Sequence, residues 1–214
     1  MGNTPFEKRN RLLGATVVKN LEKRGFAACY VETAAEAKEK ALSLIGREDV
    51  IAWGGCLSAE ECGLMDELRS GAYPNIIDRD AAKSVEERMD LMRKGLLSDV
   101  FIGGANGISE DGQIVNIDGN GNRVAAITFG PKSVIIIASV DKIAKTVEDA
   151  MARARMIAAP VNCERFDKDT PCLKTGSCAN CLSPDSICNY FQIIRRCSPA
   201  GKIKVILVGE KLGF

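Results

Sequence analysis

Apolar and polar residues follow two different periods along the first 160 residues. Residues 6–24 carry leucine and valine at helical spacing, and Gly25 stands where such a helix would end. Between the helical stretches lie short apolar runs that are typical of strands, at residues 26–31, 50–53, 75–78, 99–102 and 134–138. This alternation predicts an α/β domain built on a mainly parallel sheet flanked by helices.

Polar residues mark where several of these helices begin. Thr33 with Glu36 and Ser58 with Glu61 have the spacing of a capping box, which predicts helices running to about residues 44 and 68. A helical pattern spans residues 84–94. Asp141 is placed to cap a later helix that ends near Pro160.

Composition changes after Pro160. Five cysteines fall between residues 163 and 188, in a stretch rich in Pro, Asp, Asn and Ser that is too polar and broken for a core element. Strand character returns at residues 202–208. The sequence therefore predicts one domain over residues 1–214, with a cysteine-rich excursion at 161–197 before a final strand near 202–208.

The overall composition removes several classes of function. Twenty-nine basic residues balance 28 acidic ones, which gives no global support for binding nucleic acid or an anionic membrane. No apolar run reaches the roughly 18 residues of a membrane span, and the first 13 residues lack the apolar region of a secretion signal. We expect a soluble cytoplasmic protein, whose nine cysteines are thiols or metal ligands. The absence of histidine excludes an imidazole base and a His-containing metal shell.

The cysteines give the sharpest local motif. Cys172, Cys178, Cys181 and Cys188 lie at short spacing on a segment whose Gly176 and Pro184 allow the backbone to wrap a metal site. Thiolates select zinc or an iron–sulfur cluster, and the spacing favours iron–sulfur because it is not that of two paired zinc knuckles. Cys163 and Cys197 flank the group and could replace one ligand. Unliganded thiols are the alternative.

A second motif, WGGCLSAEECG at residues 53–63, is a strand followed by a Gly-Gly turn and a helix start. Glycines let backbone N–H groups approach an anion, so Gly54, Gly55 and Ser58 are candidate contacts. Cys56 in the same turn is a candidate nucleophile or redox thiol with a lowered pKa. The alternatives are a tight turn without a ligand and a buried, inert cysteine.

A third motif, GGANGISEDGQIVNIDGNGNR, begins after the strand at 99–102, where parallel sheets bind ligands. Candidate ligand-binding residues here are Gly103, Gly104, Asn106, Asp118, Asn120 and Asn122. Glu110 and Asp111 are the candidate catalytic carboxylates of a site without histidine. Arg123 and Lys132 are candidates to hold a carboxylate or phosphate. Turn residues and solvated charges are the alternative interpretation.

The long central motif, together with TPCLKTGSCANCLSPDSICN and the closing KVILVGEKLGF, resembles the LUD-domain proteins, the lactate-utilisation family. The resemblance covers nearly the whole chain. It implies a Rossmann-like fold of the NagB/RpiA/CoA-transferase group and a link to lactate oxidation beside iron–sulfur partner subunits. The chain departs from the family pattern at Cys56, where serine is usual, and at Gly107, where alanine is more frequent.

Three functions follow as hypotheses. In the first, the protein binds a small anionic metabolite and supports lactate or related organic-acid oxidation, with an iron–sulfur cluster or zinc in its cysteine segment. In the second, it is a stand-alone enzyme like the sugar-phosphate isomerases or CoA transferases that uses Glu110. In the third, it is a non-enzymatic subunit or regulator. Partners would be an iron–sulfur oxidoreductase subunit or a second copy of the chain.

Overall fold

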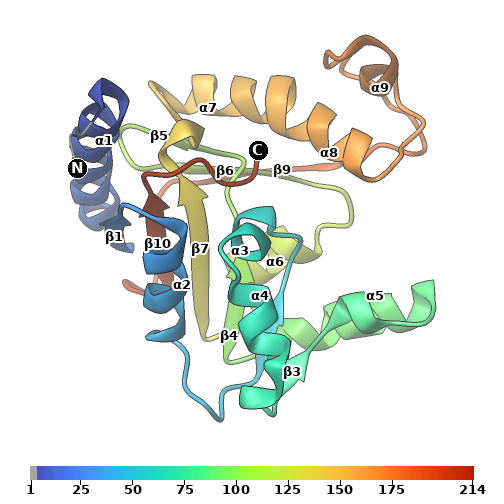
Figure 1. Cartoon of the computed structure of the whole chain (residues 1–214). Coiled ribbons are helices and arrows are strands. Elements are labelled where there is room, and N and C mark those ends of the chain that lie inside the picture. The colour runs from blue at the N-terminus through green and yellow to red at the C-terminus, as the bar shows by residue number, and fades with distance from the viewer. Residues whose placement is uncertain (1–3) are drawn as a thin grey trace.

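A parallel sheet forms the centre of the computed structural model, which describes residues 4–214 (Figure 1). Within those residues the sheet has six strands in the order β1-β10-β7-β4-β2-β3, and every pairing is parallel. The strands are β1 (Ala27–Val31), β2 (Ile51–Trp53), β3 (Ile76–Ile77), β4 (Val100–Gly103), β7 (Ser133–Ser139) and β10 (Ile203–Val208). The predicted α/β fold with a mainly parallel sheet is confirmed.

Both faces of this sheet are buried, which explains the uninterrupted apolar runs of its central strands. On one face, Ile136 of β7 packs in the same core as Leu21 of α1 (Pro5–Lys23) and Ile127 of α6 (Asn122–Thr128). On the other face, Ile135 and Ile137 join the core formed by α2 (Ala34–Leu42), α3 (Leu57–Glu61) and α4 (Leu64–Glu67). Alternate residues of one strand thus supply two cores.

A smaller mixed sheet has the strand order β8-β5-β6-β9. It is formed by β5 (Gly107–Ser109), β6 (Ile114–Asp118), β8 (Ile143–Ala144) and β9 (Tyr190–Ile194). The cysteine-rich excursion ends in a strand that the sequence analysis did not predict, because β9 pairs antiparallel with the whole of β6. This pairing fixes the end of the cysteine segment to the domain.

Two of the predicted helix starts differ from the structure. The capping box of Thr33 and Glu36 is present, whereas Ser58 caps nothing: α3 begins at Leu57, and the Ser58 hydroxyl donates instead to the carbonyl of Leu212 over 3.3 Å. Asp141 lies in a 3₁₀ turn, and Thr146 caps the helix α7 (Val147–Arg153). In both places a tertiary contact or a later residue replaces the local signal.

The helical stretch that starts at α7 also extends beyond the predicted end at Pro160. A π-helical turn over Ala154–Ala158 leads into α8 (Ala159–Arg165), and α9 (Pro171–Thr175) follows. Pro160 lies in the first turn of α8, where a missing N–H is tolerated. In Figure 1, α7 and α8 cross over the carboxyl end of β7, while α5 (Val85–Lys94) lies toward the opposite end.

The start of the chain and its membrane propensity can be described only in part. Residues 1–3, which belong to the stretch considered for a secretion signal, lie outside the described residues. Among the helices of residues 4–214, none has both the length and the apolar character needed to cross a membrane.

Gly107 sets the distance between the smaller sheet and α7. A Cβ atom at this position would lie 2.6 Å from the backbone oxygen of Ala150. We expect Gly107→Ala to lower the free energy of unfolding by about 1–3 kcal/mol, because backbone atoms must move to accept the methyl group. Gly103→Ala, whose nearest contacts would be 3.7 Å away, is the matched control in urea unfolding. Equal stabilities of the two variants would contradict this packing.

Candidate functional site

A cavity of about 610 Å³, here called the basic cavity, opens at the carboxyl ends of β2 and β4. Its wall contains residues that follow these strands, Gly55 and Asn106, and the end of β6 at Asp118. The cationic residues that line it are Arg79, Arg88, Arg123, Arg165 and Lys168. The position agrees with the general placement of ligand sites in open parallel sheets.

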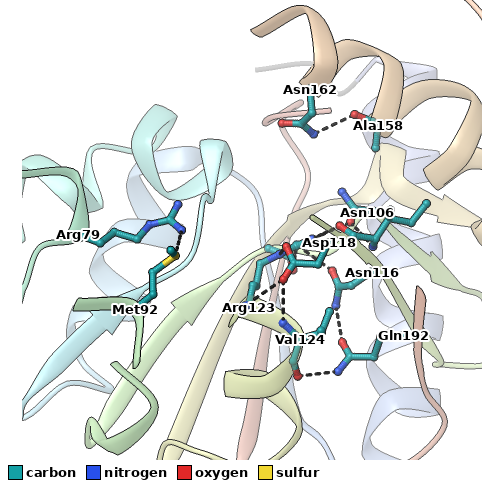
Figure 2. Close-up of polar contacts among 12 residues, drawn as sticks. Arg79, Met92, Asn106, Asn116, Asp118, Arg123, Val124, Ala158, Asn162 and Gln192 are labelled. Atoms are coloured by element: carbon teal, nitrogen blue, oxygen red, sulfur yellow. Dashed lines mark hydrogen bonds and ion pairs between the residues drawn. The ribbon is translucent and has the colours of Figure 1, made fainter. Parts of the chain in front are cut away.

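Arg123 is the buried centre of one wall. Its Nη1 donates to Asn116 Oδ1 over 3.0 Å and to the Gly104 carbonyl over 3.3 Å, and its Nη2 donates to Asn106 Oδ1 over 3.0 Å and to the Ile117 carbonyl over 2.7 Å. Figure 2 shows this guanidinium enclosed by Asn106, Asn116 and Asp118. Arg123 was predicted to bind a ligand. Its guanidinium instead donates these four hydrogen bonds to acceptors of the protein and thereby stabilises the cavity wall.

Arg79 and Arg165 have a different role, because their guanidinium groups converge on Gly55. A Cβ atom on Gly55 would lie 3.2 Å from Nη2 of Arg79 and 3.6 Å from Nη2 of Arg165. The buried Nε of Arg79 has no hydrogen-bond partner among the described residues. Arg165 stacks on Phe166, with 4.4 Å from Cζ to the ring centroid. The space above Gly55 is thus faced by two positive groups and left open by the missing side chain.

Electrostatics at Arg79 show that this positive charge is not fully compensated. Burial lowers the pKa of Arg79; Asp80 and Asp118 oppose this effect, and the nearby Arg88 and Arg123 add to it. Asp80 is shared, since it also pairs with Arg88 over 2.9 Å and Arg69 over 3.5 Å. A bound anion would offset the cost of holding Arg79 charged.

A second cavity of about 130 Å³ lies beside the basic cavity and is called the thiol cavity here. In the described chain five cysteines line it: Cys163, Cys172, Cys178, Cys181 and Cys188. Ala159 and Ser186 line both cavities, so the two share a wall. The four cysteines predicted as ligands are brought together, and Cys163 of α8 joins them. Cys197 does not line the cavity; its thiol lies 3.2 Å from the Pro199 carbonyl.

The five thiols lie close enough to influence one another. Burial, followed by the proximity of the other four thiols, raises the pKa of Cys188 to about 11. Burial and a hydrogen bond with Cys172 raise the pKa of Cys163 to about 11 as well. Arg155 places its Nη2 3.7 Å from the Cys178 sulfur. Within residues 4–214, no three Cys, His, Asp or Glu side chains are arranged to hold a metal ion as they stand.

The Gly-Gly turn contributes less directly than its sequence predicts. Gly55 lines the basic cavity, but Gly54 packs on the aliphatic part of Arg123, with its Cβ position 3.0 Å from that chain. Cys56 and Ser58 are buried below the turn and do not line it. The expected lowered pKa of Cys56 is wrong: burial raises the pKa of this thiol, despite the opposing charge of Lys142.

Several other predicted site residues lie away from the basic cavity. Glu110 and Asp111, on the turn between β5 and β6, form ion pairs with Lys145 and Arg24. Lys132 precedes β7 at the amino end of the sheet, 2.7 Å from Asp99, so it cannot reach a ligand at the carboxyl end. Gly103 and Gly104 do not line the cavity; the Gly104 carbonyl accepts a hydrogen bond from Arg123. Asn106, Asn120 and Asn122 do line the cavity.

Sequence reasoning missed most of the polar lining that comes from distant segments. These residues are Arg79, Arg88, Asn162, Arg165, Lys168 and Asn189. None of them has a ligand-binding motif of its own in the sequence, although Asn189 directly follows Cys188 of the cysteine motif. Gly55 was the only local signal for their meeting point, since a glycine at a strand end leaves room for a ligand or another side chain.

Lys142, buried beneath the Gly-Gly turn, gives the stability of the fold a measurable dependence on pH. It is 3 % exposed, its Nζ donates to Ser58 Oγ over 3.0 Å, and burial lowers its pKa from the ordinary value of 10.5. Between the lowered pKa and 10.5 the unfolded chain binds more protons than the folded chain, so this group makes stability rise with pH. We expect Lys142→Met to be more stable than the wild type at pH 7, by a margin that shrinks toward pH 10.5.

Chemical denaturation at several pH values measures this margin. Lys211→Met, which changes an exposed lysine, is the control and should follow the wild type at each pH. A constant difference between Lys142→Met and the wild type across this range would show that the ionisation of Lys142 is unaffected by folding.

The parallel sheet, with a basic cavity at its carboxyl edge, defines a Rossmann-like α/β protein. The family model of the LUD domain matches residues 15–208, and the chain belongs to this family. No curated protein matches the chain. The crystal structure of a DUF162 family protein from Deinococcus radiodurans is similar in fold, with a TM-score of 0.55 and 15 % identity over 93 % of this chain and 98 % of that one.

A more distant likeness is to ribose 5-phosphate isomerase A from Methanocaldococcus jannaschii. It has a TM-score of 0.35 and 16 % identity over 61 % of this chain and 66 % of the isomerase.

Proposed function

We propose that this LUD-domain protein binds a small anionic metabolite in the basic cavity and thereby supports the oxidation of lactate or a related organic acid. Family membership supports a role associated with lactate utilisation. The observation that carries the binding proposal is the convergence of Arg79 and Arg165 on the open space above Gly55. Guanidinium groups pair with carboxylates and phosphates through two parallel hydrogen bonds, which makes such a pair of arginines an anion site.

The cost of this arrangement without a ligand supports the same proposal. Two like charges that approach one point repel each other, and the buried Arg79 shares its one carboxylate, Asp80, with Arg69 and Arg88, so its lost hydration is replaced only in part. A carboxylate or phosphate above Gly55 would relieve both effects. The glycine matters because a methyl group there would project into the space between the two guanidiniums and obstruct the anion.

Thermal unfolding with a panel of anions tests the binding site, because a ligand that binds the folded state raises Tm. L-lactate, pyruvate, succinate and orthophosphate form the panel. At least one should raise Tm of the wild type and of Gly103→Ala, and none should do so for Gly55→Ala. Equal shifts in Gly55→Ala and the wild type would place the anion elsewhere.

The link to lactate needs a test in the organism of origin. Loss of the gene should slow growth on lactate and leave growth on glucose unchanged. The wild-type gene should restore growth, and the Gly55→Ala gene should not. Unchanged growth on lactate without the gene would contradict this part of the proposal.

We further propose that the thiol cavity holds an iron–sulfur cluster, with a single zinc ion as the alternative. Five thiols around about 130 Å³ supply more than the four ligands that such a cluster takes. Arg155 beside Cys178 can offset the negative charge of ligated thiolates. The cluster is preferred to zinc because the spacing of the four cysteines is not that of two paired zinc knuckles.

When bound, a cluster would supply electron exchange, for which an iron–sulfur oxidoreductase subunit is the fitting partner; zinc would only cross-link the segment. Purification without oxygen, followed by analysis of iron, zinc and acid-labile sulfide, decides between them. Iron with equimolar sulfide supports the cluster, and zinc alone supports the alternative. The absence of all three from anaerobically prepared protein would contradict a metal site.

A further inference from the structure

The charges around the basic cavity do not balance. Three of its cations have a carboxylate partner, in the pairs Arg88–Asp80 at 2.9 Å, Arg123–Asp118 at 3.6 Å and Lys168–Asp185 at 3.2 Å. The other two lining cations of the described chain are Arg79 and Arg165. Arg79 reaches only the shared Asp80, over 3.7 Å, and Arg165 has aromatic neighbours but no ion-pair partner in residues 4–214.

The two unmatched charges are close together. The Nη2 atoms of Arg79 and Arg165 both lie within 3.6 Å of one point, the Cβ position of Gly55. They come from different parts of the fold, the turn after β3 and the end of α8, and only the cavity brings them together. Arg165 has no carboxylate partner in the described chain and Arg79 only a share of Asp80, so the positive charge that meets at this point is best matched by a compact group with two negative charges.

We infer that the ligand of the basic cavity is a phosphomonoester, whose phosphate lies above Gly55 between Arg79 and Arg165. This rests on the proposed anion site and narrows it. A phosphomonoester carries a charge near −2 at neutral pH and three terminal oxygens that can accept hydrogen bonds from both guanidiniums. A monocarboxylate such as lactate leaves one guanidinium uncompensated. A dicarboxylate separates its two charges, whereas the two arginines meet at one place.

The remainder of the cavity fits a polar, hydroxyl-bearing body attached to that phosphate. Asparagines line it, at positions 120, 122, 162 and 189. Asn162 of α8 donates its Nδ2 to the Ala158 carbonyl over 2.9 Å, which leaves its Oδ1 as an acceptor for a ligand donor. In Figure 2, Arg79 lies to the left of the Arg123 cluster and Asn162 lies above it, and both line the basic cavity, so the ligand would extend from Arg79 toward Asn162.

Isothermal titration of the full chain at low ionic strength and pH 7.5 tests the inference. The probes are glycerol 3-phosphate, orthophosphate, L-lactate and succinate. Glycerol 3-phosphate should bind about tenfold or more tightly than lactate, the equivalent of at least one additional charge-assisted hydrogen bond. Its affinity should fall toward that of lactate at pH 5.5, below the second phosphate pKa of about 6.

Two variants connect this preference to the arginines. Arg165→Gln should reduce the preference for phosphate over lactate to less than about threefold, because a single positive charge remains at Gly55. Arg79→Gln should reduce the preference in the same way, provided that this variant folds. Arg165 is exposed, so Arg165→Gln is expected to fold and tests the inference by itself. Arg93→Gln changes a surface arginine paired with Asp90 and is the control.

The outcomes separate this inference from the anion site itself. Lactate or succinate binding as tightly as glycerol 3-phosphate, or a phosphate preference that survives in Arg165→Gln, would overturn the phosphomonoester and leave the anion site standing. Failure of all four probes to bind would overturn both.

Discussion

Replacement of Arg123 by methionine is expected to lower the free energy of unfolding by about 3–5 kcal/mol, the range for breaking a buried charged pair by removing one partner. The substitution keeps much of the aliphatic packing against Gly54 but removes all four hydrogen bonds that the guanidinium donates. Asn106 and Asn116 would then remain in the wall without the donor that organises them. Urea unfolding of the two proteins measures the difference.

Two further variants show whether shape or charge is responsible. Arg123→Lys keeps the charge without the planar fork, so it should lose nearly as much stability as Arg123→Met. Arg93→Met removes an exposed arginine and should stay within about 0.5 kcal/mol of the wild type. A loss below about 1 kcal/mol for Arg123→Met would show that the Arg123 network is not what holds the cavity wall together.

Serine in place of Cys172 or Cys188 is expected to remove most of the metal from protein prepared without oxygen. Both thiols line the thiol cavity, and a hydroxyl does not replace a thiolate as a ligand of iron or zinc at neutral pH. Metal binding also stabilises the folded state of the segment that supplies the ligands. The variants should therefore have a lower Tm than the metal-loaded wild type and the same Tm as the metal-free wild type. Metal analysis and thermal unfolding of the same samples measure both effects.

Cys29 provides the control for these variants. It is a half-buried thiol on β1, outside the thiol cavity, and Cys29→Ser should keep its metal. Cys163→Ser decides which four of the five thiols are ligands: full metal content in this variant supports the set Cys172, Cys178, Cys181 and Cys188. Metal retained in both Cys172→Ser and Cys188→Ser would contradict a site in this cavity.

Helix α8 joins the two cavities. Cys163 faces the thiol cavity, Asn162 and Arg165 face the basic cavity, and Ala159 lines both. The cysteine segment likewise supplies Asp185, Ser186 and Asn189 to the basic cavity. The segment that looked in the sequence like an appendage is therefore part of the wall of the proposed ligand site.

The fold could be predicted from the sequence because its signals are local. The apolar β-branched run at residues 134–138 has the pattern of a strand buried on both faces, and β7 extends it by only one residue at each end. One helix start was predicted wrongly because a residue five positions later, Thr146, is the cap, and another because of a contact with a distant residue. Ser58 has the spacing of a helix cap, but its hydroxyl is bonded to the distant Leu212.

The residues of the candidate site were harder to predict from the sequence, because which charged side chains pair depends on the three-dimensional fold. Lys132 and Arg123 look alike in the sequence, yet one is on the surface at the amino end of the sheet and the other is buried in the cavity wall. Arg79 and Arg165 are 86 positions apart in the chain and meet only over Gly55. The grouping of Cys172, Cys178, Cys181 and Cys188 could be predicted because these residues are close in sequence. Cys163, which the sequence analysis named as a flanking thiol, lines the same cavity.

The most direct test of the ligand site is a crystal structure of the protein grown with glycerol 3-phosphate. The account predicts a phosphorus atom above Gly55, with phosphate oxygens accepting hydrogen bonds from Nη2 of Arg79 and Nη2 of Arg165, and the glycerol part directed toward Asn162. Phosphate density elsewhere on the molecule, with the space above Gly55 filled only by solvent, would contradict it.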